Sequence, residues 1–174
     1  MKKILLTLLV LLVVATGTLF VLNGKDTYDA SKYSASLSDG LKKGSRVAFT
    51  LPDQFDKTHS LSNSISTIIF VASKSTGHTV KAFLKEKPAD YLEKHHALFV
   101  ADISPMPVII RNTFALPDLK KQHYSVLLIY DEKISEAFKK GVDTEKIIVA
   151  TLENGTVTEV KTLESDKVLA ETLK

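Results

Sequence analysis

Ser75 and His78 are the first residues in this chain whose types and spacing could perform chemistry. They follow an apolar run and stand three positions apart in the stretch Ser75-Thr76-Gly77-His78. If a helix begins here, the two side chains are neighbours, and a serine beside a histidine could form a nucleophile and its base. Such a pair also needs an orienting third residue and an oxyanion hole, and the chain has no Gly-x-Ser-x-Gly sequence. We therefore favour a structural role, in which Ser75 or Thr76 caps the helix and His78 lies in its exposed first turn.

A second group of candidate residues follows the next apolar run, which ends at Asp102. Met106 and Pro107 stand in the loop after it, and Arg111 follows Pro107 by about one helical turn. An ion pair between Asp102 and Arg111 would fix the loop, which is the structural interpretation. The alternative is a binding surface of Asp102, Met106, Pro107 and Arg111, because methionine adapts to a peptide partner and proline holds the loop in shape.

The chain offers no set of side chains for a metal ion or a redox cofactor. His95 and His96 are adjacent, so their side chains diverge, and no histidine or carboxylate at ligand spacing completes a site. They fit better as a pair that closes a helix. There is no cysteine, which excludes a thiol nucleophile and a disulfide framework. Because a glycine-rich dinucleotide loop is also absent, we predict no metal and no cofactor.

These candidates must be positioned by strands that end just before them. Residues 66–72 and Ala97–Asp102 are apolar on both faces, as central strands of a covered sheet are. We expect a helix over residues 77–85 after the first strand, and a helix from Pro107 that is closed by Pro117 after the second. Both candidate groups then lie at the carboxyl edge of one sheet, where α/β proteins often keep their sites.

The rest of the chain supplies the edges of the sheet and its outer helices. Residues 45–50 and 124–131 resemble strands, and residues 132–141 form an amphipathic helix pattern that ends in glycine. Asn154-Gly155 between two strand-like runs predicts a type I′ hairpin, and Ser165 predicts the start of a last helix. The fold class that we predict is α/β, a mixed sheet with helices on both faces and a C-terminal β-hairpin plus helix.

The amino-terminal part predicts a location in the cell. Residues 1–22 form a signal or anchor segment, because two lysines precede an apolar run over residues 4–22 that is longer than most cleaved signals. We expect an anchor in the inner membrane or a cleaved signal, with the rest of the chain in the periplasm. Residues 23–44 are polar and predict a linker, which leaves residues 45–174 as the folded domain. The net charge is +3 and no basic patch alternates with aromatic residues, so nothing points to nucleic acid as a partner.

Several phrases of the sequence resemble the thioredoxin-like fold in its exported variants. FTLPDQFDKTHSLS is similar to the leader phrase of thiol-disulfide and peroxiredoxin-type members, STIIFVASKSTGH to the strand that enters the redox loop, and IIVATLENGTV to the late hairpin. The segment FVADISPMPVIIRNTFALP also resembles short exported bacterial proteins that share this fold and lack its cysteines. The resemblance extends from about Arg46 to the C terminus, and it implies a thioredoxin-like sheet over that part of the chain.

The departures from that pattern decide the function that we expect. The resemblance places Ser75 and His78 where the two cysteines of Cys-x-x-Cys stand, and Lys146 or its neighbour where a proline normally enters the hairpin strand. Serine cannot exchange disulfides, so thiol-disulfide oxidoreductase activity is excluded. We expect an exported, non-redox binding or accessory module of the cell envelope, with an envelope protein or peptide as its partner. Two alternatives stay open: an enzyme of unknown reaction that uses the Ser75/His78 and Asp102/Arg111 loops, and a structural envelope component.

Overall fold

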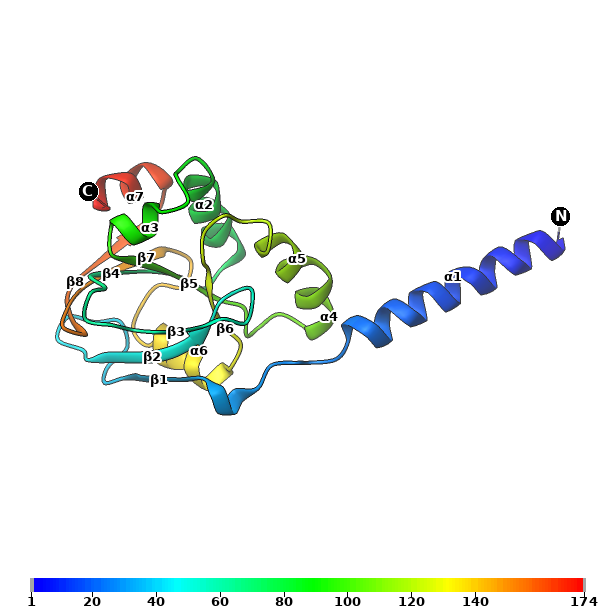
Figure 1. The fold of residues 1–174 in the computed structure, drawn as a ribbon, viewed down its shortest axis with the longest axis horizontal. Helices are drawn as coiled ribbons and strands as arrows, with labels where there is room; N and C mark the ends of the chain where they lie inside the picture. Colours follow the sequence, from blue (N-terminus) through cyan, green and yellow to red (C-terminus); the bar gives the residue numbers. More distant parts are fainter. Residues whose placement is uncertain (1, 174) are drawn as a thin grey trace.

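Two β-sheets and the helices around them form the folded part of this chain (Figure 1). The computed structural model describes residues 2–173. The larger sheet has the strand order β6–β5–β4–β7–β8, and the smaller sheet has the order β1–β2–β3. The strands are β1 Ser34–Leu37, β2 Val47–Pro52, β3 Thr58–Ser60, β4 Thr67–Val71, β5 Ala97–Asp102, β6 Leu127–Ile129, β7 Ile147–Glu153 and β8 Thr156–Leu163.

The larger sheet is mixed, and its central strands are buried on both faces. β4, β5 and β6 run parallel, whereas β7 is antiparallel to both β4 and β8. In β4, Ile69 and Val71 belong to one hydrophobic cluster, and Ile68 and Phe70 belong to the other. Because successive side chains of a strand point to opposite faces, a strand between two clusters must be apolar throughout. The mixed sheet predicted from the sequence is therefore confirmed.

Helices cover both faces of the larger sheet. α2 (Lys74–Lys85), α3 (Tyr91–Lys94) and α7 (Asp166–Thr172) lie on one face, and α6 (Glu132–Lys139) lies with the smaller sheet on the other. Phe138 of α6 is fully buried, and its ring centroid lies 5.4 Å from that of Phe70. Asp131 caps α6 by accepting from the backbone N–H groups of Lys133 and Ile134, which confirms this helix. The strand expected over residues 124–131 is shorter, since only β6 pairs in the sheet.

The C-terminal hairpin has the predicted turn. Asn154 and Gly155 both have positive φ, at 48° and 75°, which is the requirement of a type I′ turn between β7 and β8. After β8, Ser165 occupies the N-cap position of α7, and Leu169 and Leu173 are buried in the core. The predicted C-terminal hairpin plus helix is therefore confirmed.

The segment before residue 45 packs more closely than the sequence indicates. Its residues 34–37 form β1, which pairs with β2 along its whole length, and Leu41 has no exposed surface. The expectation of a linker over residues 23–44 is wrong for this part. Short serine- and alanine-rich edge strands carry little hydrophobic pattern, so the polar composition concealed the pairing.

The helix after β5 does not end at Pro117 as expected. α4 (Val108–Ile110), a π-helical turn η2 (Arg111–Ala115) and α5 (Leu116–Leu119) follow one another without interruption. The N–H of Leu116 donates to the carbonyl oxygen of Arg111, five residues back, instead of four. A wider turn of this kind gives Pro117 a place early in α5, where its missing N–H leaves no gap. The proline therefore lies inside the helical segment.

The amino-terminal helix projects away from the folded part. α1 (Lys2–Asn23) extends outward in Figure 1, and residues 24–29 lead from it to the short helix η1 (Ala30–Lys32). Within residues 2–173, no helix combines the length and the hydropathy that crossing a membrane requires.

Candidate functional site

Asp102 is held by side chains of its own loop and of α6. One carboxylate oxygen accepts from the backbone N–H and the hydroxyl of Ser104, at 3.0 and 2.7 Å. The other accepts from the Ser135 hydroxyl at 2.6 Å and lies 3.0 Å from the Lys139 ammonium. The Asp102 side chain has no exposed surface. The carboxylate therefore ties the end of β5 to α6, and the ion pair expected between Asp102 and Arg111 is wrong.

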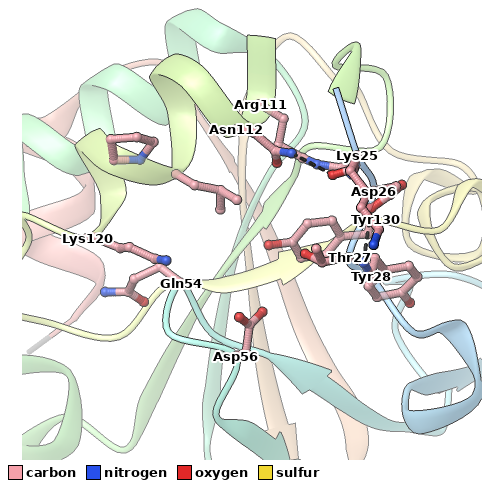
Figure 2. Close-up of a pocket in the computed structure, with 12 residues that line it drawn as sticks. Lys25, Asp26, Thr27, Tyr28, Gln54, Asp56, Arg111, Asn112, Lys120 and Tyr130 are labelled. Carbon is pink, nitrogen blue, oxygen red and sulfur yellow. Dashed lines mark hydrogen bonds and ion pairs between the residues drawn. The ribbon is translucent and has the colours of Figure 1, made fainter. Parts of the chain in front are cut away.

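Arg111 pairs instead with a residue far away in the sequence. Its Nη2 donates to Asp26 Oδ1 at 2.7 Å, and the neighbouring Asn112 side chain donates to the carbonyl oxygen of Lys25 at 3.0 Å. We call residues 25–28 the strap, because these two bonds fasten them across the start of η2 (Figure 2). Arg111 is only 4% exposed, and its Nε has no hydrogen-bond partner in the described part of the chain.

Tyr28 of the strap belongs to a stack of three tyrosines. Tyr28 stacks on Tyr130 and on Tyr33, with ring centroids 4.8 and 5.5 Å away, and the Arg111 guanidinium lies 4.7 Å from the Tyr130 centroid. A guanidinium over an aromatic face is attracted to the ring electrostatically. The ring of Tyr130 therefore helps to fix the plane in which Arg111 presents its donors.

Burial and charge set the protonation of these groups. Burial raises the pKa of Tyr28 to about 12, and the nearby Asp131 carboxylate adds to the rise. Burial also raises the pKa of Tyr130 above its usual range. At Asp26, burial acts to raise the pKa, but the Tyr28 N–H and the Arg111 guanidinium outweigh it and hold the pKa below its ordinary value. Near neutral pH the phenols are neutral and the Asp26 carboxylate is ionised.

A pocket of about 300 Å³ is bordered by Asp26, Tyr28, Arg111 and Tyr130. The strap, the segment η2–α5, the loop after β2 and the residue after β6 form its walls (Figure 2). The lining residues are Lys25, Asp26, Thr27, Tyr28, Gln54, Asp56, Arg111, Asn112, Leu116, Pro117, Lys120 and Tyr130. The buried Gln54 side chain bonds to the backbone of Tyr124 and Val126 at 2.7 and 2.8 Å, so the loop after β2 is fixed in place. Three basic and two acidic side chains line the pocket, which suits a ligand with a single negative charge.

Three exposed apolar side chains lie on segments that also form walls of the pocket. Phe55 stands between two lining residues of the β2–β3 loop and is 57% exposed. Ile110 and Phe114, 45% and 64% exposed, are four positions apart on the helical segment that also carries Arg111. Sequence reasoning missed these three residues. The spacing of Ile110 and Phe114 was the available signal, since residues four apart share one face of a helix.

The other predicted site residues lie outside the pocket. α2 begins one residue earlier than Ser75, with Ser73 as N-cap, and Thr76 completes a capping box. The expectation that Ser75 or Thr76 is the cap is therefore wrong. Ser75 and His78 are exposed on the first turns of α2, as expected, and the Ser75 hydroxyl lies 3.0 Å from that of Ser73.

The two candidate residues in the loop after β5 differ in their exposure. Met106 is half-buried against the core instead of being exposed, whereas Pro107 is exposed. Arg111 alone lines the pocket among the six candidate site residues, which are Ser75, His78, Asp102, Met106, Pro107 and Arg111. The Ser75/His78 loop thus contributes nothing to the pocket, and the Asp102/Arg111 loop contributes Arg111 without Asp102.

No protein-family model matches this sequence, and no curated protein matches it. Solved structures with a similar fold include an uncharacterized thioredoxin-like protein from Porphyromonas gingivalis, at 18% identity and a TM-score of 0.46 over 71% of this chain and 86% of that chain. A putative protein disulfide isomerase from Bacteroides thetaiotaomicron has 14% identity and a TM-score of 0.49 over 82% and 88%. An exposed lipoprotein thioredoxin from Streptococcus pneumoniae has 13% identity and a TM-score of 0.49 over 72% and 97%.

The order of the elements decides the fold. A parallel β4–α2–β5 unit is followed by the antiparallel β7–β8 hairpin and α7, and all of these strands share one sheet with helices on both faces. The chain has a thioredoxin-like fold. It contains no cysteine, so this thioredoxin-like chain has no Cys-x-x-Cys motif and no thiol chemistry.

Proposed function

We propose that this chain is an exported, non-redox binding module of the cell envelope, which holds a protein or peptide partner at the mouth of the Arg111 pocket. The observation that carries the proposal is a pocket with a buried arginine, whose walls belong to segments that also carry exposed Phe55, Ile110 and Phe114. Exposed apolar side chains that lie close together are typical of protein contact surfaces. The absence of cysteine supports a role in binding over one in redox chemistry.

The enzyme alternative is weaker on the same geometry. A nucleophile needs its base and an oxyanion hole around one point, but Ser75 bonds to Ser73 and the Asp102 carboxylate is enclosed by Ser104, Ser135 and Lys139. Neither group lines the pocket. A purely structural envelope component would have no need of a pocket with a buried arginine, which favours the binding role.

A photo-crosslinking experiment in living cells tests the proposed partner surface. A photoreactive amino acid at Phe114 should give discrete adducts with an envelope protein or peptide, because this side chain is 64% exposed on the helical segment that carries Arg111. The same amino acid at Lys133, exposed on α6, serves as the matched control and should give none of these bands. Identical bands at both positions, or no band at Phe114, would contradict the proposal.

The proposed export rests on the lysines and the apolar run at residues 1–22. We expect a reporter that is active only in the cytoplasm to be silent when it is fused after Lys174 of the full chain. The same reporter fused to residues 24–174 should be active, since that fusion lacks the apolar run. Strong reporter activity from the full-length fusion would refute an envelope location.

A further inference from the structure

The Nε–H group of Arg111 is a buried donor without a hydrogen-bond partner among the described residues. Nε and Nη2 form one edge of the guanidinium, a fork that matches the two oxygens of a carboxylate. Asp26 Oδ1 fills the Nη2 position at 2.7 Å, whereas the buried Nε has no partner in the described residues. Buried donors in proteins are almost always paired, so an unpaired Nε on a residue that is 4% exposed calls for an explanation.

We infer that the Nε/Nη2 edge of Arg111 is the binding position for a carboxylate of the partner, and that Asp26 of the strap occupies this edge while the partner is absent. The inference rests on the proposed binding function and names the chemistry that the pocket would recognise. A carboxylate set on both donors would satisfy Nε as well as Nη2, which Asp26 does not. The incoming charge would also replace that of Asp26, so the charge beside Arg111 would be unchanged.

The strap is largely exposed and lies outside both sheets, so few contacts oppose its displacement. Lys25, Asp26 and Thr27 are exposed, and the Asp26 side chain is 48% exposed although its partner Arg111 is buried. Beyond the Asp26 ion pair, the strap is held by the bond from Asn112 to Lys25 and by the stacking of Tyr28. Its backbone belongs to neither sheet, so its release would break no strand pairing.

The surroundings favour a carboxylate over a more highly charged anion. Outside the strap, Lys120 adds positive charge at the pocket beside Arg111, but Asp56 lines it too and would repel a second negative charge. The face of the Tyr130 ring contacts the guanidinium and helps to hold it in position. A monoanionic carboxylate, from a peptide C terminus or from an acidic side chain, fits these groups best.

The arginine content makes a direct test possible. Arg46 and Arg111 are the two arginines of the chain, so a spectrum of ¹⁵N-labelled arginine shows two Nε–H signals. We expect acetate, and a neutral tetrapeptide with a free C-terminal carboxylate, to shift the Arg111 signal of the full chain in detergent micelles and not that of Arg46. Inorganic phosphate should bind more weakly than the peptide. The same tetrapeptide as its C-terminal amide should have no effect, whereas an amidated peptide with one aspartate shows whether a side-chain carboxylate suffices.

Substitutions in the strap test the displacement of Asp26. Asp26→Asn should raise the peptide affinity, measured by calorimetry, by about fivefold or more, because the internal competitor for Arg111 is lost. Asp29→Asn is the matched control, since Asp29 caps η1 and pairs with Lys32, and it should leave the affinity unchanged. An Arg111 signal that no carboxylate moves, or equal affinity in Asp26→Asn and wild type, would overturn the inference. Adducts at Phe114 in cells would then still support the proposed function, so the two failures are distinguishable.

Discussion

We expect Asp102→Asn to lower the free energy of unfolding by about 1–3 kcal/mol, the usual cost of leaving a buried hydrogen-bonding group without its partner. The carboxylate accepts from Ser104 and Ser135 and pairs with Lys139, whose side chain is 29% exposed. The amide of asparagine has one acceptor oxygen instead of two and carries no charge. Lys139 would therefore lose its ion pair, and one of the serine hydroxyls would lose its acceptor.

Thermal melting measures this effect against a matched substitution. A loss of this size lowers Tm by roughly 2–12 °C in a domain of this length. Asp90→Asn removes a carboxylate that pairs with Lys94 but is 48% exposed, and such surface pairs contribute little. Its Tm should stay close to that of wild type. Equal shifts in the two variants would show that Asp102 does not brace β5 against α6.

Asp102 also shows where reasoning from the sequence succeeds and where it ends. The apolar run before it predicts β5 correctly, because a strand covered on both faces has a clear composition. The partner of its carboxylate comes from α6, 33 positions later, and that of Arg111 comes from the strap, 85 positions earlier. Spacing along the chain reports local neighbours and carries no information about such distant pairs. The predicted pair between Asp102 and Arg111 joined two residues of one loop, and it was wrong because both partners lie far away in the sequence.

The pocket was hidden from the sequence for a related reason. Its walls come from four separate segments, and one of them, the strap, falls in a stretch that the sequence marks as a linker. Polar composition does indicate the absence of a core-forming pattern, but it does not exclude specific contacts such as the stacking of Tyr28 on Tyr130. Arg111 was found because an arginine after a strand end is uncommon in this chain, whereas Gln54 and Tyr130 carried no signal.

The resemblance places Ser75 and His78 at the positions of the two cysteines of a Cys-x-x-Cys motif. Both residues lie on the first turns of α2, directly after β4. Residues three apart on a helix have Cβ atoms about 5–6 Å apart, close enough for a disulfide after small adjustments. The amino-terminal end of a helix also lowers the pKa of a cysteine thiol, which promotes its oxidation. We therefore expect the double variant Ser75→Cys/His78→Cys to form an intramolecular disulfide in mild oxidant.

A second double variant is the control, because it carries two thiols that do not face each other. Ser75→Cys/Gly77→Cys introduces as many thiols, but residues two apart on a helix do not face each other. A Cβ at Gly77 would meet only a Val71 methyl carbon, at 3.9 Å, so this variant should fold. Thiol titration and mass spectrometry should show a disulfide in the first variant and two free thiols in the second, and the wild type should not reduce insulin. Equal oxidation of both pairs, or no disulfide in the first, would mean that residues 75–78 do not have the geometry of a redox loop.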